Sequence, residues 1–182
     1  MRKIVAGLFI TLDGVVESPE QWQGPYFNDE MGVAVGSLMS GADTMLLGRV
    51  TYQEFAAFWP NQSSDDPFAA HMNGTPKYVV STTLETVEWQ NSTLLAGNVA
   101  EELTKLKQQP GKNIGITGSA TLIRSLLRDH LLDELQLLVH PIVVGSGKRL
   151  FPEGSDRVAL RLVDAQTFST GVLSLTYTPA GQ

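Results

Sequence analysis

The sequence predicts a single α/β domain, residues 1–182, whose central sheet is mostly parallel and carries antiparallel strands at its C-terminal edge. Up to about residue 128, apolar β-branched runs alternate with helical segments, the order that builds a parallel sheet covered by helices. After residue 132 only strand-like runs follow, which favours antiparallel pairing. The 182 residues are 42% hydrophobic and 18% charged, and no repeat or low-complexity linker divides them, so one core is expected.

Helices are predicted where a capping residue or a glycine precedes a segment with a helical apolar pattern. Asn28 is a good N-cap, and the acidic residues Asp29 and Glu30 that follow it favour the positive start of a helix. Asn98 caps a later helix, which Pro110 ends. The predicted helices are residues 28–41, 50–58, 98–108 and 119–128.

Strands are predicted from short runs rich in β-branched and apolar residues. The first run ends at the turn pair Asp13-Gly14, and the polar segment 14–28 that follows is long enough to be a functional loop. Near the C-terminus, Ser169-Thr170-Gly171 predicts a hairpin turn. The predicted strands are residues 3–11, 42–47, 77–81, 87–89, 93–95, 113–117, 134–144, 158–167 and 172–178.

Charge and residue usage exclude several kinds of function. The formal net charge is −6 with no stripe of Lys and Arg, so binding to nucleic acid is not expected, although a phosphorylated ligand remains compatible. There is no cysteine, and His71, His130 and His140 lack metal-ligand spacing, so no metal site is expected. The first apolar run stops at Thr11, too short for a signal peptide or a membrane span, so a cytoplasmic protein without membrane contact is expected.

The first candidate site is the junction Leu47-Gly48-Arg49-Val50-Thr51-Tyr52, where a glycine follows a strand and a helix begins. Glycine lets the backbone approach a ligand, and the first N–H groups of a helix bind anions. Arg49 can add a charge-assisted hydrogen bond to a phosphate. An ordinary helix start with Arg49 in solvent explains this segment equally well.

The second candidate is Thr117-Gly118-Ser119-Ala120-Thr121, which repeats this pattern with hydroxyl groups in place of the cation. Two such junctions on neighbouring parallel strands are more informative than one, because ligands of α/β proteins bind at the carboxyl ends of strands. Ser81-Thr82-Thr83 follows the third strand and offers hydroxyl groups at the same edge, although a polar turn explains it too.

Two further segments carry possible ligand groups. Asp13 and Gly14 follow the first strand, where a ligand-facing carboxylate and a simple turn are equally good interpretations. Gly145-Ser146-Gly147-Lys148-Arg149 can wrap a phosphate or a carboxylate, or it can be a flexible turn with solvated cations. His140 lies within an apolar strand, where an interior histidine is more usual than a catalytic base.

Taken in order, these segments resemble a known family. They are similar to the C-terminal reductase domain of the bifunctional riboflavin-biosynthesis deaminase/reductase, and more closely to the stand-alone dihydrofolate reductase family proteins related to it. The matching segments are Thr11–Gly14, Leu47–Tyr52, the turn at Ser81, Gly118–Leu122, Leu132–Leu135 and Pro141–Phe151. The resemblance covers nearly the whole chain and implies a dihydrofolate-reductase-like three-layer fold.

The resemblance also implies a cofactor and its contacts. It implies NADPH, with its phosphates on the two helix starts, its adenosine side at the turn after the third strand, and its nicotinamide beside the first strand. The cofactor residues implied are Gly48, Arg49, Val50, Thr51, Ser81, Thr82, Thr83, Gly118, Ser119, Ala120 and Thr121. The substrate residues expected are Gly14, Trp22, Tyr52, Gly145 and Gly147, with Asp13 as the catalytic residue. Family members often form homodimers through the C-terminal strands, so a homodimer is expected.

Two positions depart from the dihydrofolate reductase pattern. Those enzymes have a Gly-Gly pair before the second phosphate helix, whereas this chain has Thr117-Gly118. They also use an acidic residue on the first helix to bind the pterin, whereas helix-dipole stabilisation explains Asp29 and Glu30 here. Folate is therefore not the expected substrate.

The resulting hypothesis is an NADPH-dependent oxidoreductase of the 5-amino-6-(5-phosphoribosylamino)uracil reductase or dihydrofolate reductase type. It would transfer hydride to a small pterin- or pyrimidine-like heterocycle or to a phosphosugar derivative, with Asp13 orienting substrate or relaying a proton. The alternative is a non-catalytic nucleotide- or pterin-binding protein that retains the fold. A structural dimer module is a third possibility.

Overall fold

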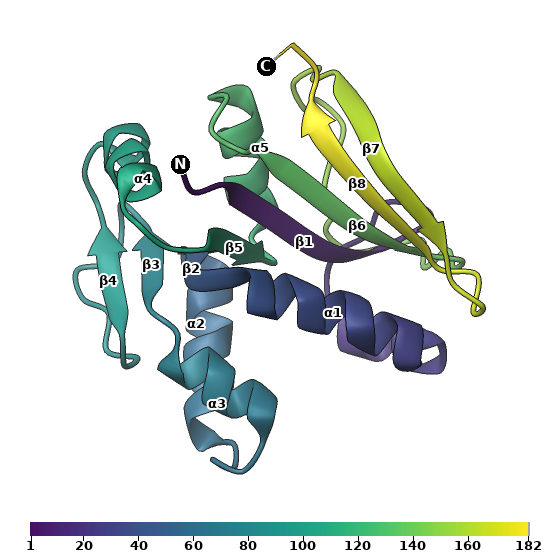
Figure 1. Ribbon diagram of the computed structural model, residues 1–182, viewed down its shortest axis with the longest axis horizontal. Helices are drawn as coiled ribbons and strands as arrows, with labels where there is room; N and C mark the ends of the chain where they lie inside the picture. The colour runs from purple at the N-terminus through teal and green to yellow at the C-terminus, as the bar shows by residue number, and fades with distance from the viewer. Residues whose placement is uncertain (182) are drawn as a thin grey trace.

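One eight-stranded sheet organises the computed structural model, which describes residues 1–181 (Figure 1). The strands are β1 (Ile4–Thr11), β2 (Ala42–Gly48), β3 (Lys77–Val80), β4 (Ser92–Leu95), β5 (Asn113–Thr117), β6 (Glu134–His140), β7 (Leu160–Thr167) and β8 (Leu173–Pro179). Their order across the sheet is β4-β3-β2-β5-β1-β6-β8-β7. The pairs from β4 to β6 are parallel, while β8 is antiparallel to both β6 and β7. The predicted mixed sheet with an antiparallel C-terminal edge is confirmed.

Helices cover both faces of the parallel part of the sheet, which confirms three layers (Figure 1). The helices are α1 (Asp29–Gly41), α2 (Arg49–Phe58), α3 (Pro67–Gly74), α4 (Val99–Gln108) and α5 (Ala120–Arg128), with short 3-10 turns at Pro19–Gln21, Gly24–Tyr26 and Trp59–Asn61. Residues of α4 and α5 pack on one face, and residues of α1, α2 and α3 pack on the other.

The alternation of side chains along the strands builds the two halves of the core. On β2, Leu46 joins the cluster under α4 and α5, whereas Met45 and Leu47 join the cluster under α2. Both faces of this strand are therefore covered, and its apolar run does not alternate with polar residues, as expected for a buried parallel strand. Burial of each such side chain contributes roughly 1.5–3 kcal/mol, and this packing fixes the ends of the central strands.

The N-terminal caps of two helices are as predicted. The side chain of Asn28 accepts a hydrogen bond from the Met31 N–H at the start of α1. Asn98 accepts one from the Glu101 N–H at the start of α4. The C-terminal hairpin is also confirmed: the Gly171 N–H donates to the Phe168 carbonyl at 2.9 Å, and Gly171 has φ +88°.

Two sequence predictions are wrong, and one helix was not predicted. Residues 87–89 do not form a strand, because the Tyr52 hydroxyl takes the N–H groups of Glu88 and Trp89 and leaves none for a ladder. Strand β6 ends at His140 and not at residue 144, since the N–H groups of Val144 and Gly145 turn toward another acceptor, described below. Helix α3 was not predicted, although Asp66 caps it and Pro67 begins it.

Residues 1–181 contain neither a membrane-spanning helix nor a cluster of metal-binding side chains. No helix there combines the length and the apolar character that crossing a bilayer requires. That part of the chain also holds no group of three or more His, Asp or Glu side chains arranged to bind a metal ion.

Candidate functional site

The two glycine-headed junctions lie side by side. Strands β2 and β5 are parallel neighbours, so their carboxyl ends bring the start of α2 next to the start of α5. The Gly48 N–H donates to the Ser119 hydroxyl at 2.9 Å, and the Ser119 N–H donates to the Thr51 hydroxyl at 3.0 Å. A Cβ on Gly118 would lie 3.1 Å from the Thr51 methyl carbon, so only glycine fits this contact comfortably. The two helix starts are thus joined reciprocally.

These two helices differ from the other three in how they begin. Helices α1, α3 and α4 each have a side chain that accepts a hydrogen bond from a first-turn N–H. Helices α2 and α5 have no such side-chain cap. The first-turn N–H groups of both therefore lack a side-chain acceptor at the same edge of the sheet. Such groups carry the positive end of the helix dipole and bind anions.

The backbone at the start of α5 is held in an uncommon conformation. Gly118 has φ +73°, and Ser119 has φ 59° and ψ 49°, the left-handed region. A non-glycine residue there costs roughly 1–2 kcal/mol, and such residues cluster at ligand sites. The peptide bond before Gly118 is trans, since residues 1–181 contain no cis peptide. Thr117 therefore leads into this turn without the Gly-Gly pair of dihydrofolate reductases.

The remaining predicted cofactor residues surround this edge. Arg49 is exposed, and its guanidinium donates to the Gln53 side chain at 3.1 Å, one turn along α2. Val50 is 40% exposed at the first turn of α2. On α5, Ala120 is half-buried, and the Thr121 hydroxyl accepts from Arg124 at 3.2 Å.

The turn after β3 lies beside the carboxyl end of β2 and is stabilised from within. The buried Ser81 hydroxyl accepts from the Thr83 N–H at 3.1 Å and the Leu84 N–H at 3.0 Å. Ser81 is thus used for the turn itself. Thr82 is exposed and has no hydrogen-bonding partner among the described residues, so its hydroxyl is available to a ligand.

The Asp13 carboxylate accepts hydrogen bonds from three neighbouring donors. It accepts from the Thr11 hydroxyl at 2.5 Å, from the Gly145 N–H at 2.9 Å and from the Val144 N–H at 3.3 Å. These hydrogen bonds, the one from Thr11 above all, outweigh partial desolvation and lower the pKa of Asp13 to about 2. The carboxylate is therefore ionised at neutral pH.

The glycine-rich segment after β6 wraps a carboxylate, as one interpretation of the sequence allowed, but the carboxylates belong to the protein. Besides Asp13, Glu17 accepts from the Lys148 N–H at 3.1 Å. Arg149 donates through Nε to the Asp13 carbonyl at 3.1 Å. The turn is tight: a Cβ on Gly147 would lie 2.8 Å from a Val15 methyl carbon. The loops after β1 and β6 are joined as one unit, and the sequence offers no signal for the part that Glu17 plays.

Trp22 holds the loop 14–28 from inside. It is only 7% exposed, and its indole N–H donates to the Glu17 carbonyl at 3.2 Å. Its ring meets the fully buried His140 edge-on, as do the rings of Phe9 and Tyr26. His140 Nδ1 lies 2.8 Å from the Leu138 carbonyl oxygen, and burial lowers the pKa of the imidazole. His140 is an interior residue, in agreement with the sequence interpretation.

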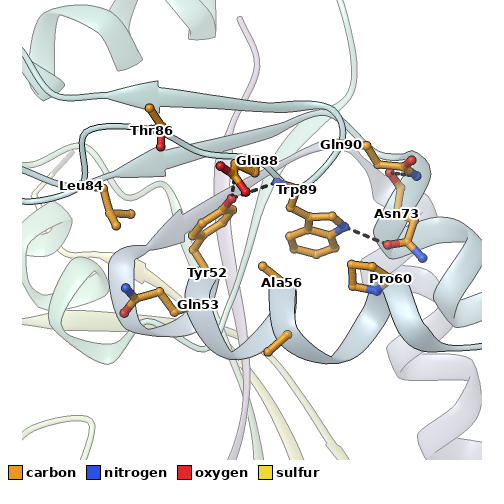
Figure 2. Close-up of a pocket in the computed structure, with 11 residues that line it drawn as sticks. Tyr52, Gln53, Ala56, Pro60, Asn73, Leu84, Thr86, Glu88, Trp89 and Gln90 are labelled. Carbon is orange, nitrogen blue, oxygen red and sulfur yellow. Dashed lines mark hydrogen bonds between the residues drawn. The ribbon is translucent and has the colours of Figure 1, made fainter.

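The joined starts of α2 and α5 are called the phosphate cradle below. Two cavities lie beside these helices, and each is lined by one of the predicted residues. The larger, about 720 Å³, runs along the flank of α2 and includes Tyr52 (Figure 2). The smaller, about 380 Å³, lies between α5 and the segment 151–158 and includes Thr121. Neither of these two cavities is lined by Asp13, Gly14 or Trp22.

A family model matches most of the chain. Residues 2–174 match the model described as the RibD C-terminal domain. Two proteins of Bacillus subtilis strain 168, both uncharacterized, are similar over nearly their whole lengths. YyaP is 32% identical over 97% of this chain and 94% of its own length. YwjB is 27% identical over 94% of this chain and 95% of its own length.

Solved structures share the fold. A protein of Shewanella sp. PV-4, provisionally named a riboflavin biosynthesis protein, has a TM-score of 0.78 at 21% identity. The match covers 97% of this chain and 98% of the Shewanella chain. The riboflavin biosynthesis reductase Rib7 of Saccharomyces cerevisiae has a TM-score of 0.63 at 16% identity, covering 98% and 90%. Dihydrofolate reductase from Enterococcus faecalis, solved with NADP(H), has a TM-score of 0.62 at 14% identity, covering 98% and 96%. The dihydrofolate-reductase-like fold is thereby confirmed.

Proposed function

Since the chain belongs to the RibD C-terminal domain family, we propose that it is an NADPH-dependent reductase that acts on a small pterin- or pyrimidine-like heterocycle or a phosphosugar derivative. The reductases among its structural neighbours support an oxidoreductase. The neighbour solved with NADP(H) supports the cofactor. The cytoplasm is the proposed location, as the sequence composition favours.

The pair of uncapped helix starts carries this proposal. A dinucleotide brings two linked phosphates, and two anion-binding helix starts joined through Gly48, Thr51 and Ser119 offer adjacent sites for them. Arg49 is exposed on the first turn of α2 and is held by one hydrogen bond to Gln53, so it can turn toward a phosphate at low cost. The exposed hydroxyl of Thr82 suits the adenosine side.

Asp13, Gly14, Gly145 and Gly147 form the proposed substrate side. When bound, NADPH supplies the hydride, and the protein supplies binding and orientation. Because its pKa is about 2, Asp13 orients a donor group of the substrate or a water molecule and does not itself deliver a proton. Trp22 and His140 support this side by holding the loop 14–28 in place.

A homodimer through the C-terminal strands is also part of the proposal. Strand β7 is the edge strand at the C-terminal side of the sheet, opposite β4. Leu162 and Val163 on β7 are 50% and 49% exposed, and Leu173 on β8 is 38% exposed. An apolar edge of this kind is usually covered by a partner.

NADPH titration followed by fluorescence tests the cofactor. We expect saturable binding in the micromolar range, and Arg49→Ala should weaken NADPH about tenfold, the loss of one charge-assisted hydrogen bond. NADH, which lacks the 2′-phosphate, is the control ligand. Arg49→Ala should weaken the binding of NADH less than it weakens the binding of NADPH. Absence of saturable NADPH binding would contradict the proposal.

The reaction is tested separately with a panel of pterins, pyrimidines and phosphosugar derivatives. We expect at least one compound to cause oxidation of NADPH, measured as loss of its nicotinamide absorbance. NADPH binding without oxidation across the panel would favour the non-catalytic nucleotide- or pterin-binding protein.

A further inference from the structure

The larger cavity is separate from the phosphate cradle. Thr51 and Tyr52 are consecutive on α2, and successive residues of a helix point about 100° apart. The Thr51 hydroxyl accepts from Ser119 at the cradle, whereas the Tyr52 hydroxyl accepts from the N–H groups of Glu88 and Trp89. The two side chains therefore face different sides of α2 and contact different segments. Figure 2 shows the cavity between α2 and the segment that carries Leu84 to Gln90.

The walls of this cavity are held in place without a ligand. The Tyr52 hydroxyl lies 3.0 Å from the Glu88 nitrogen and 3.1 Å from the Trp89 nitrogen. The Trp89 indole N–H donates to the Asn73 side chain at 2.8 Å, and the Lys77 ammonium lies 4.2 Å from the centre of the indole ring. A volume of about 720 Å³ falls in the range of roughly 300–1,000 Å³ typical of small-molecule sites.

Polar groups in these walls remain available. The Tyr52 oxygen accepts two hydrogen bonds, and its own hydrogen has no acceptor among the described residues, although Tyr52 is only 6% exposed. The backbone N–H and carbonyl of Thr86 likewise make no hydrogen bond to another described residue. Tyr52 is buried, and buried donors usually have a partner, whereas Thr86 is exposed and its backbone is open to solvent or to a ligand. The cavity thus offers a donor from Tyr52 and a donor–acceptor pair from Thr86.

The charge and the shape of the cavity lining limit the chemical class of ligand that fits. Glu88 is the one ionisable side chain of the lining besides Tyr52, and no Lys, Arg or His lines the cavity. A phosphate would meet a carboxylate and no cation there. Ala56, Pro60 and Leu84 supply apolar surface against which a flat ring can lie.

We propose that this cavity binds an uncharged, planar nitrogen heterocycle with a donor–acceptor edge, such as a nucleobase, independently of the cofactor cradle. Tyr52 donates to a ring nitrogen or carbonyl oxygen. The Thr86 backbone pairs with the donor–acceptor edge, and Ala56 and Leu84 contact the ring faces. The site does not depend on the proposed reductase function.

The test is a titration of the ¹⁵N-labelled full chain with free adenine and cytosine, followed by NMR. We expect saturable shifts of the Trp89 indole N–H and of the Thr86 and Glu88 amides. The corresponding 5′-monophosphates should bind at least severalfold more weakly, because Glu88 repels the phosphate. Saturating NADPH should leave the shifts caused by the free bases in place.

Two variants of exposed helical alanines provide a test and its matched control. Ala57→Met narrows the cavity from α2 and should abolish the shifts, while Ala100→Met on α4 should leave them unchanged. A native-like spectrum of each variant verifies its fold. The proposal is overturned if neither base gives saturable shifts, if Ala57→Met binds like the parent, or if the monophosphates bind as tightly as the bases. Loss of the shifts with NADPH would assign the cavity to the cofactor and would also overturn it.

Discussion

Asp13 joins two loops that lie 131 residues apart in the sequence. Its carboxylate takes donors from Thr11 on one side and from Val144 and Gly145 on the other. The sequence showed the Asp-Gly pair and left a turn and a ligand role open. The Val144 and Gly145 partners of Asp13 could not be predicted, because they depend on where β6 ends. That end in turn depends on Asp13, which draws these N–H groups away from the strand.

Asp13→Asn should loosen this connection in a pH-dependent way. The pKa of Asp13 is about 2 in the folded protein against an ordinary value of 3.8, so its contribution to stability is present above about pH 4 and is lost as the pH falls toward 2. We expect a lower melting temperature for the variant at neutral pH and a shrinking difference from the parent in acid.

A second measurement separates positioning from cofactor binding. With a substrate identified, Asp13→Asn should lower turnover by up to about a hundredfold, as misplacement of reacting groups does, with little change in NADPH affinity. Unchanged turnover would remove Asp13 from the mechanism, and a constant melting difference across the acid range would contradict the low pKa.

At the scale of elements, the two helix starts show what local sequence can and cannot indicate. Gly48 and Gly118 mark the ends of β2 and β5, and the strand–glycine–helix pattern was visible in the sequence. The hydrogen bonds that Ser119 makes with Gly48 and with Thr51 were not, because they join segments that meet only when the strands pair.

The predicted strand 87–89 is wrong for the same reason, because Tyr52 comes from a distant segment. Helix α3 was missed although Asp66 and Pro67 mark its start, and only its end depends on a contact without a local signal. The C-terminal end of α3 is stabilised by the buried Lys77, whose ammonium donates to the carbonyl groups of Met72, Asn73 and Thr75. Burial lowers the pKa of Lys77 to about 8. In the sequence, Lys77 is simply the first residue of a strand, so its role in ending a helix has no local signal.

Thr51→Val tests the connection between the helix starts. The substitution keeps the shape of the side chain and removes the acceptor of the Ser119 N–H, at a cost of about 1–3 kcal/mol in the free energy of unfolding. NADPH binding should weaken as well, because α5 loses its fixed orientation. Chemical denaturation and NADPH titration measure the two effects.

Thr51→Ser is the matched control, since it keeps the hydroxyl and should retain NADPH affinity. Equal NADPH affinity in Thr51→Val and the parent would show that the two helix starts do not need this hydrogen bond to bind the cofactor.

At the scale of the whole molecule, the sheet has two unlike halves. The parallel half is covered by helices on both faces, whereas most of β7 is exposed. The order of elements along the chain was sufficient to predict this division, because alternation gives way to strands alone after α5.

Leu162→Lys tests the proposed dimer. Leu162 is 50% exposed, so the fold should tolerate the change, and a charge on each copy should shift the protein from dimer to monomer. Sedimentation analysis measures the mass. Val33→Lys, at a 74% exposed position on α1, is the control and should leave the dimer intact. A monomeric parent protein would contradict the proposal.

The joined loops after β1 and β6 have a consequence for how such a protein diversifies. The proposed cofactor edge is built on β2 and β5, and the proposed substrate side on β1 and β6, with each pair held by its own hydrogen bonds. Changes at one pair therefore leave the other largely undisturbed. If these assignments hold, a lineage can alter its substrates through residues 14–28 and 141–151 while the proposed cofactor edge stays unchanged. A laboratory library restricted to those two segments would explore the same freedom.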